Sequence, residues 1–274
     1  MYSQERKAEI INLLTQQTSV SVSVLAQTLR TSKETIRRDL SDLEADGILS
    51  RTHGGAILNS NPLHVSAGAK YHTSLLNNEY PFAQRHARNI PAKKKIAQKA
   101  ASLIQDKDTI FIDNSSTTLF LMDYIPRNIQ LTIITNSINV LLESAKIDNP
   151  HLSLISLAGF YNCTNYSLYG SRTIRSAAEF YPDKSFFSCT GVSLDKLLTD
   201  ISLHEVDTKQ AMMEKSRENY LLVDHTKFET ASPFFLSSYD RIDCIITDKY
   251  DYPESVSRTL ETITSKHNVR ILIN

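Results

Sequence analysis

The chain begins with a helical pattern of apolar positions and then changes to a pattern of short strands. Apolar residues recur every three or four positions in three successive segments: Ile10, Leu13 and Leu14; Val24, Leu25 and Leu29; and Ile36, Leu40 and Leu43. This spacing gives each helix one apolar stripe, which predicts three helices packed on one another. Gly47 then ends the third helix, and Ile48–Arg51 and Ala56–Leu58 flank a tight turn, which predicts a β-hairpin.

From about residue 85 the pattern alternates short β-rich apolar runs with helical stretches. The runs are Thr109–Ile112, Leu131–Ile134, Leu152–Leu157, Ser185–Cys189, Tyr220–Val223, Cys244–Thr247 and Val269–Ile273. The helical stretches are Lys94–Ile104, Thr117–Tyr124, Ile138–Ala145, Ser171–Phe180, Val206–Asn219 and Glu254–Ser265. Such alternation predicts a Rossmann-like, mostly parallel sheet covered on both faces. We therefore expect an α/β protein with a helical domain over 1–58, an extended polar linker over 59–84 and an α/β domain over 85–274.

Composition limits the location and the chemistry of the protein. No apolar run approaches the ~20 residues that a membrane span needs, and the charged start MYSQERKAEI lacks the apolar core of a secretory signal. The three cysteines are odd in number and widely spaced, and no Cys or His pair has ligand spacing. These features argue against a disulfide framework and a metal site. We expect a cytoplasmic protein with no cofactor and no membrane partner.

The third predicted helix carries a basic face. Its buried stripe leaves Lys33, Thr35, Arg37, Arg38 and Ser41 pointing away from the first two helices. Arginine can donate two hydrogen bonds to guanine or bind a phosphate group, so this face suits the major groove of DNA. The alternative is an ordinary amphipathic helix with a solvated charged face. The net charge of zero, from 30 basic and 30 acidic residues, argues against a nucleic-acid binder, although phosphate contact depends on a local patch.

The flanks of this helix add to the DNA-binding interpretation. Thr31 or Ser32 can cap the helix, and Thr31 with Glu34 fits a capping box. In the hairpin that follows, Arg51 and His53 are placed to reach the DNA backbone or the minor groove.

The whole of residues 1–58 resembles the helix-turn-helix of the DeoR family. The matching residues are Leu25-Ala26, Leu29, Ser32, the run Thr35–Leu40 (TIRRDL), Leu43, Gly47 and the run Arg51–Ala56 (RTHGGA). The resemblance implies a winged helix-turn-helix whose partner is double-stranded operator DNA. It implies DNA contacts from Ser32, Lys33, Thr35, Arg37, Arg38, Arg51 and His53.

In the second domain, polar residues gather where the predicted strands end. Asp113–Thr118 follows the first strand and opens a predicted helix, Thr135-Asn136-Ser137 follows the second, and Gly159 follows the third. Ligands of open parallel sheets bind beyond the carboxyl ends of the strands. The hydroxyls and free backbone N–H groups of Ser115–Thr118, at the start of a helix, form a phosphate cradle in chemical terms. Hydroxyl caps are common at helix starts, so this loop alone equally fits an ordinary N-cap.

This domain also resembles the DeoR sensor domain, which is similar in fold to ribose-5-phosphate isomerase and typically binds a phosphorylated sugar or related metabolite. The matching pieces are Asp113–Thr118, Thr135-Asn136-Ser137, Ala158-Gly159, Gly170, His204–Lys209 and Leu222–Phe228. The resemblance implies an effector site made of Lys93, Asp113, Ser115, Ser116, Thr117, Thr118, Thr135, Asn136, Gly159, Glu205, Lys209 and Lys227. The family's usual glycines are replaced by Ser115 and Ala158, which implies altered phosphate geometry or ligand selectivity.

Other interpretations of these residues stay open. The basic run between Arg85 and Lys99 fits three interpretations. It can be the solvated face of a helix, it can contact DNA phosphates, or its Lys93 can contact an anionic ligand. Glu205 and Lys209, at i and i+4, also fit a surface ion pair.

These features predict a transcriptional regulator. We expect a repressor of a carbohydrate-utilisation operon that works as a homodimer or homotetramer and responds to a phosphorylated sugar. One alternative is a sugar-phosphate isomerase or hydrolase with a DNA-binding appendage. Another is an architectural DNA-binding protein without an effector.

Overall fold

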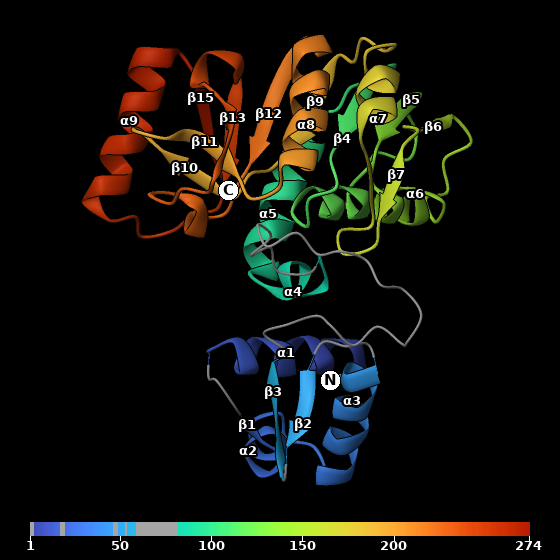
Figure 1. Cartoon of the computed structure of the whole chain (residues 1–274), viewed down its shortest axis with the longest axis vertical. Coiled ribbons are helices and arrows are strands. Elements are labelled where there is room, and N and C mark those ends of the chain that lie inside the picture. The colour runs from blue at the N-terminus through green and yellow to red at the C-terminus, as the bar shows by residue number, and fades with distance from the viewer. Residues whose placement is uncertain (1–2, 17–19, 46–48, 53, 59–81) are drawn as a thin grey trace. The chain divides into compact units, whose positions relative to one another are not determined.

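A computed structural model describes residues 3–16, 20–45, 49–52, 54–58 and 82–274 of the chain (Figure 1). The described residues up to 58, with residues 83–88, form one compact unit, and residues 82 and 89–274 form the other. The expected linker over 59–84 lies almost wholly outside the described residues, as do Gly47 and His53. The domain limits that the sequence indicates therefore stay a prediction. No helix in the described part of the chain is long and apolar enough to cross a membrane.

The first unit has the expected helices and hairpin. Its elements are α1 (Ser3–Gln16), β1 (Val20–Ser21), α2 (Val22–Thr28), α3 (Lys33–Ala45), β2 (Leu49–Thr52) and β3 (Gly55–Leu58). The strand pair β2–β3 is antiparallel, and β1, which the sequence pattern did not predict, pairs with β3. Ile10, Leu25, Ile36 and Leu40 are fully buried between the helices. The apolar stripes of the three helices therefore form the core, as predicted.

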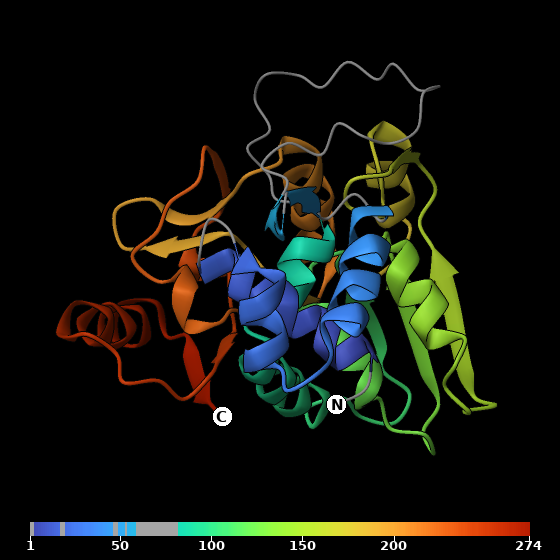
Figure 2. The ribbon, with the colours of Figure 1, turned by 90° about the horizontal axis from the view of Figure 1, so that it is seen from below.

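The second unit is built on a parallel sheet. Among the described residues seven strands pair in the order β15 (Arg270–Ile273), β14 (Cys244–Thr247), β12 (Glu218–Leu222), β9 (Lys184–Phe187), β4 (Thr109–Ile112), β5 (Leu131–Thr135) and β6 (Leu152–Ser156). Every neighbouring pair is parallel. The chain order reverses between β4 and β9, which makes their carboxyl ends the topological switch point of the sheet. Figure 2 shows α9 and β15, in red, at one end of this unit and the green segment with β5 and β6 at the other.

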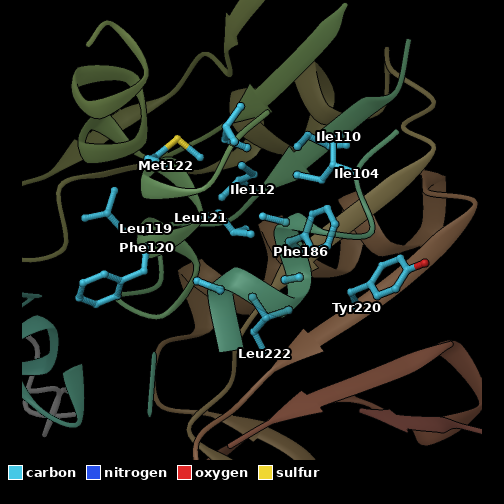
Figure 3. Packing of buried hydrophobic residues seen from close by; sticks show 14 of the residues in the cluster. Ile104, Ile110, Ile112, Leu119, Phe120, Leu121, Met122, Phe186, Tyr220 and Leu222 are labelled. Carbon is cyan, nitrogen blue, oxygen red and sulfur yellow. The ribbon is translucent and has the colours of Figure 1, made fainter. Parts of the chain in front are cut away.

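Helices cover both faces of the sheet, as the unbroken apolar runs of the strands predict. They are α5 (Ile90–Ala101), α6 (Ile138–Ser144), α7 (Ser171–Ala177), α8 (Leu203–Lys215) and α9 (Glu254–His267). The short helix α4 (Phe82–Ala87) precedes α5 in the chain, and its residues from 83 onward belong to the first unit. On one face α5 and α6 pack on Ile110, Ile112 and Phe186 (Figure 3). On the other face α8 and α9 pack on Phe187 and Leu221. Alternate residues of each strand thus face opposite helix layers.

The structure of the second unit differs from the sequence-based expectation in three places. The stretch expected as a helix over Thr117–Tyr124 is a 3-10 helix, η1 (Thr118–Asp123), because the hydroxyl groups at its start bond to nearby polar groups and compete with helical hydrogen bonds. Two small antiparallel sheets were not expected. They are the hairpin β7 (Phe160–Asn162) and β8 (Ser167–Tyr169), and the sheet of β10 (Gly191–Ser193), β11 (Leu197–Asp200) and β13 (Phe234–Ser237). Strands of three or four residues are too short to show a period of two.

Candidate functional site

The third helix of the first unit presents a polar and mostly basic face. Lys33, Arg37 and Arg38 are exposed, while Ile36 and Leu40 on the opposite side are fully buried. The Ser32 hydroxyl caps the helix by accepting a hydrogen bond from the Thr35 N–H at 3.1 Å. The expected capping box of Thr31 with Glu34 does not form, because the Glu34 carboxylate instead accepts a hydrogen bond from Arg37 at 2.8 Å.

Two of the arginines expected to contact DNA, Arg37 and Arg51, have partners within the protein. The Arg37–Glu34 pair is exposed on both sides, so it is weak and can be exchanged for a contact with phosphate or a base edge. The Arg51 guanidinium donates a hydrogen bond to the Ser41 hydroxyl at 2.7 Å, and its backbone N–H donates to the Glu44 carboxylate at 2.9 Å. Arg51 therefore fixes strand β2 against α3. His53 lies outside the described residues.

A buried ion pair that the sequence did not reveal holds α3 in place. The Arg6 guanidinium on α1 donates two hydrogen bonds to the Asp39 carboxylate on α3, at 2.5 and 3.1 Å. The Asp39 side chain is only 3% exposed. A bidentate pair of this kind sets both the distance and the orientation of two helices. Asp39, inside the TIRRDL run, thus orients the helix that carries the basic face.

We expect Asp39→Asn to destabilise the first unit by roughly 1–3 kcal/mol, because the partly buried Arg6 guanidinium loses the buried carboxylate that pairs with it. Calorimetry of the full-length chain measures this as a lower unfolding temperature of that unit. The matched control is Asp42→Asn on the same helix, because Asp42 pairs with Lys7 at 2.7 Å but its side chain is 51% exposed. The control should change stability by less than about 1 kcal/mol. Equal effects of the two substitutions would show that the Arg6–Asp39 pair does not orient the helix.

At the switch point of the second unit, a fully buried carboxylate joins two loops. Asp113 Oδ1 accepts hydrogen bonds from the Ser115 N–H at 3.0 Å and from the Thr118 hydroxyl at 2.6 Å. Its Oδ2 accepts a hydrogen bond from the Ser188 N–H at 3.1 Å and lies 3.3 Å from Lys209 Nζ. Asp113 therefore ties the loop after β4 to the loop after β9.

Lys209 of α8 is held between two carboxylates. Its ammonium group donates hydrogen bonds to Asp200 at 2.7 Å and to the Ser188 carbonyl at 2.8 Å, in addition to its ion pair with Asp113. Burial alone would lower the pKa of Lys209, but Asp200 and Asp113 outweigh burial and hold that pKa above its ordinary value. The lysine is thus a permanent buried cation. Asp200, on the unexpected strand β11, completes this cluster, and its place there could be found only from the fold.

Glu205 and Lys209 do not form a surface ion pair in the structure. Both side chains are buried, at 3% and 6% exposure. The Glu205 carboxylate accepts hydrogen bonds from the Ser167 hydroxyl at 2.8 Å and from the Asn165 amide at 3.4 Å. Glu205 is therefore bound to the β7–β8 hairpin, which the sequence pattern did not predict.

The loop after β4 has two backbone donors without an acceptor in the described part of the chain. The Ser115 and Thr118 hydroxyls bond to each other at 2.7 Å. The Ser116 hydroxyl accepts a hydrogen bond from Lys93 Nζ at 3.1 Å. The N–H groups of Ser116 and Thr117 have no hydrogen-bond partner among the described residues. Adjacent N–H groups of this kind beside a lysine have the chemistry that suits an anion, although they belong to a loop before a 3-10 helix and not to the expected α-helix.

Two further lysines come together at the carboxyl end of the sheet. Lys93 lies in the first turn of α5 and is 4% exposed, and Lys227 lies in the 3-10 helix η2 (His225–Lys227) after β12. Both act on Asp224. Burial would raise the pKa of Asp224, but Lys227, the Thr226 hydrogen bonds and Lys93 together lower it. Lys93 thus donates a hydrogen bond to the Ser116 hydroxyl and also acts on the negative charge of Asp224.

The remaining candidates mostly have structural contacts. The Thr135 hydroxyl donates to the Ile112 carbonyl at 2.6 Å and accepts from the Ser137 N–H at 3.0 Å. The Asn136 amide donates to the Leu168 carbonyl at 3.2 Å, and its buried carboxamide oxygen has no partner among the described residues. Gly159 is exposed.

The chemistry of this site is that of binding. Burial raises the pKa of the neighbouring Cys189 thiol to about 12, so it is not an activated nucleophile. A groove of about 870 Å³ lies at the opposite, amino-terminal edge of the sheet. Charged side chains in its wall are already paired, Lys184 with Asp108 at 2.5 Å and Arg270 with Glu218 at 3.9 Å. The candidate effector residues are not part of that groove.

Comparison with known proteins covers nearly the whole chain. Residues 6–61 match the DeoR-like helix-turn-helix domain, and residues 88–249 match the DeoR C terminal sensor domain. The chain is 32% identical over 248 residues to the HTH-type transcriptional regulator GolR of Listeria innocua, covering 90% of this chain and 91% of that protein. It is 29% identical over 267 residues to the glycerol-3-phosphate regulon repressor of Escherichia coli, covering 97% and 98%.

A further relative and one solved structure complete the comparison. The chain is 30% identical over 266 residues to the lactose phosphotransferase system repressor of Staphylococcus epidermidis, covering 96% of this chain and all of that protein. Ribose 5-phosphate isomerase A from Methanocaldococcus jannaschii superposes with a TM-score of 0.36 at 16% identity, over 51% of this chain and 55% of that one. An overlap of this extent supports no conclusion about function.

Proposed function

The chain belongs to the DeoR family of DNA-binding transcriptional regulators, and from this premise we propose that it represses a carbohydrate-utilisation operon until a phosphorylated sugar or related metabolite binds its sensor domain. It is a regulator and not an enzyme, as its named relatives are. Two of these relatives are named as repressors of the glycerol-3-phosphate regulon and of the lactose phosphotransferase system, which supports a role in carbohydrate metabolism.

For the DNA-binding half, the proposed contacts come from the basic face of α3 and its flanks. Lys33, Arg37 and Arg38 project from the exposed side of a helix whose other side is fixed by the core and by the Arg6–Asp39 pair. Ser32 and Thr35 stand at the amino end of that helix, where such helices contact base edges. One such unit reads too few base pairs for useful specificity. The protein therefore acts on operator DNA in the cytoplasm as a homodimer or homotetramer.

For the sensor half, the observation that carries the proposal is the anion site at the switch point. The unpartnered N–H groups of Ser116 and Thr117 stand beside Lys93, while Asp113 and Lys209 hold the loop that carries them. Backbone N–H groups and a lysine suit a phosphate group. Asn136 and Glu205 supply oxygen acceptors for sugar hydroxyls. The effector controls DNA binding only if its affinity differs between the DNA-competent and DNA-incompetent states.

A thermal-unfolding screen tests the sensor half. Full-length protein is mixed with pentose phosphates, hexose phosphates, their unphosphorylated sugars and inorganic phosphate. We expect at least one ester to stabilise the protein, by about 2.7 kcal/mol at 100 times its dissociation constant, while the matched unphosphorylated sugar does not. Chemical analysis of the same mixtures should show no conversion of the ester. Sustained conversion would favour a sugar-phosphate enzyme, and the lack of stabilisation by every ester would contradict the proposal.

A further inference from the structure

The β7–β8 hairpin lies across two of the candidate effector residues. Asn136 exchanges two hydrogen bonds with Leu168 of the hairpin, from the Leu168 N–H to the Asn136 carbonyl at 2.7 Å and from the Asn136 amide to the Leu168 carbonyl at 3.2 Å. Glu205 accepts the Ser167 hydroxyl hydrogen bond at 2.8 Å. Asn136 and Glu205 are only 2% and 3% exposed. The hairpin is therefore in direct contact with the two side chains that the proposed function assigns to the sugar hydroxyls.

The hairpin is built so that it can separate from the sheet. It forms a two-stranded sheet of its own, and such a unit is only marginally stable by itself. Its outer face is open to solvent, with Phe160 64% and Tyr161 52% exposed. Besides its bonds to Asn136 and Glu205, it is held by the bridge of Ser137 with Ser167, by the hydrogen bond from the Ile138 N–H to the Tyr166 carbonyl at 2.8 Å, and by the packing of the Tyr169 ring on His204 with centroids 4.5 Å apart. All of these contacts are local to the hairpin, so they can break together without disturbing the seven-stranded sheet.

A glycine stands at each end of the hairpin. Gly170, after β8, has a φ of 100°, which side chains rarely allow. Gly159, before β7, packs so closely that a Cβ there would lie 2.1 Å from the Thr173 hydroxyl and 2.8 Å from the Tyr169 carbonyl oxygen. Glycines at the ends of a small element are suited to act as hinges. The close packing of this position on Thr173 and Tyr169 therefore accounts for a glycine at position 159. No phosphate contact is needed to explain it.

The turn of the hairpin is bonded to the start of α4. The Phe82 N–H donates a hydrogen bond to the Thr164 carbonyl at 3.2 Å, and the Phe82 ring meets the Tyr166 ring edge to face, with centroids 6.1 Å apart. Phe82 is the first residue of α4 and is 6% exposed within the sensor core. In sequence, α4 follows residues 59–81, which come directly after the DNA-binding unit. A shift of the turn therefore acts on the segment through which the two units are connected.

We propose that the β7–β8 hairpin is a movable cover of the effector site, and that Tyr166 and Phe82 pass its open or closed state to the head of α4. The proposal rests on the proposed function, because the site beneath the hairpin must take the effector. Closure over a ligand adds contacts from Ser167 and Leu168 that the open state lacks. The ligand thereby favours one position of Phe82, which is the differential binding that allosteric control requires.

Amide hydrogen exchange of the full-length protein without ligand tests the cover itself. The Leu168 and Ile138 N–H groups hold the hairpin closed, whereas the Ile133 N–H lies inside the sheet between β4 and β6. We expect the Leu168 and Ile138 amides to exchange at least about 100-fold faster than the Ile133 amide, because they open locally. Equal protection of all three amides would overturn the cover, whatever binds to the site.

Operator binding tests the coupling through Tyr166. The probes are ribose 5-phosphate, glycerol 3-phosphate and fructose 1-phosphate, with inorganic phosphate as reference. For the probe that changes wild-type operator affinity most, we expect Tyr166→Ala to reduce the change from about 5-fold or more to under about 2-fold. Tyr166→Phe, which keeps the ring on Phe82, should retain the wild-type change. Tyr161→Ala, on the same hairpin, controls for general loosening.

Two results separate the possible failures. If Tyr166→Ala retains the full wild-type response to the probe, the coupling through Phe82 is wrong. If none of the probes changes the operator affinity of the wild-type protein, the result counts against the proposed effector function. The hydrogen-exchange result then still decides whether the hairpin opens on its own.

Discussion

Replacing Arg37 and Arg38 together with alanine is expected to weaken operator binding by about 30-fold or more. An arginine that reads a base edge contributes about 1–3 kcal/mol, so two of them contribute about 2–6 kcal/mol. Both residues lie on the exposed face of α3, opposite the buried Ile36 and Leu40. Fluorescence anisotropy with labelled operator DNA measures the loss. Stability and effector binding should be unchanged, because neither arginine packs in a core.

The matched control removes the same amount of charge from the sensor unit instead of from α3. Lys146, just after α6, and Arg258, on α9, are both exposed, and each is paired with a glutamate three or four residues away. Lys146→Ala with Arg258→Ala should leave operator affinity within about 3-fold of the wild type, as expected for exposed charges that salt screens and that do not contact the DNA. Equal losses in the two double variants would mean that only net charge matters, and α3 would then not be the DNA-reading helix.

Lys209→Met is expected to destabilise the sensor unit by roughly 3–5 kcal/mol at neutral pH. The substitution leaves Asp113 and Asp200 buried without the cation that lies between them, and an unpaired buried charge has a cost of this order. Urea denaturation of the full-length protein measures the change. Lys215→Met on the same helix is the control, because Lys215 lies over the Tyr181 ring near the surface and contributes less than about 1 kcal/mol.

The pH dependence of the variant distinguishes charge from packing. In the wild type the pKa of Lys209 is raised, so its stabilising effect is complete below the unfolded pKa of about 10.4 and is lost only as pH rises through the folded value. In Lys209→Met, one carboxylate takes up a proton more readily in the folded state, so stability should rise as pH falls from 8 to 5. The double variant Lys209→Met with Asp200→Asn should recover much of the loss at pH 8. A loss that is equal at both pH values and is not recovered would indicate packing alone.

The elements of the large sheet could be predicted because of where they lie in the fold. Strands such as Thr109–Ile112 are buried on both sides, so their apolar runs are unbroken and their ends fall at polar residues. The switch point was not predicted, because it depends on the order of the strands, which only the structure shows. The helix-turn-helix was equally predictable, because its stripes of Ile36 and Leu40 repeat at helical spacing.

The contacts that organise the two sites could not be predicted from local sequence. Arg6 with Asp39, and Asp200 with Lys209, are pairs brought together by packing of separate elements, and no spacing in the chain marks them. The β7–β8 hairpin has strands of three residues, which are too short for a periodic signal. Its position over Asn136 and Glu205 changes the interpretation of both residues, since each is covered in the structure.

The central claim is that a phosphorylated ligand in the switch-point site changes the affinity of the protein for DNA. The most direct test measures operator affinity of the full-length wild type and of Lys93→Gln, with and without the ester that stabilises the wild type most. We expect the ester to weaken wild-type operator binding by about 5-fold or more. Lys93→Gln loses the cation beside Ser116. It should bind operator with wild-type affinity, and the ester should not change that affinity. An ester that stabilises the wild type but leaves its operator affinity unchanged would contradict the claim.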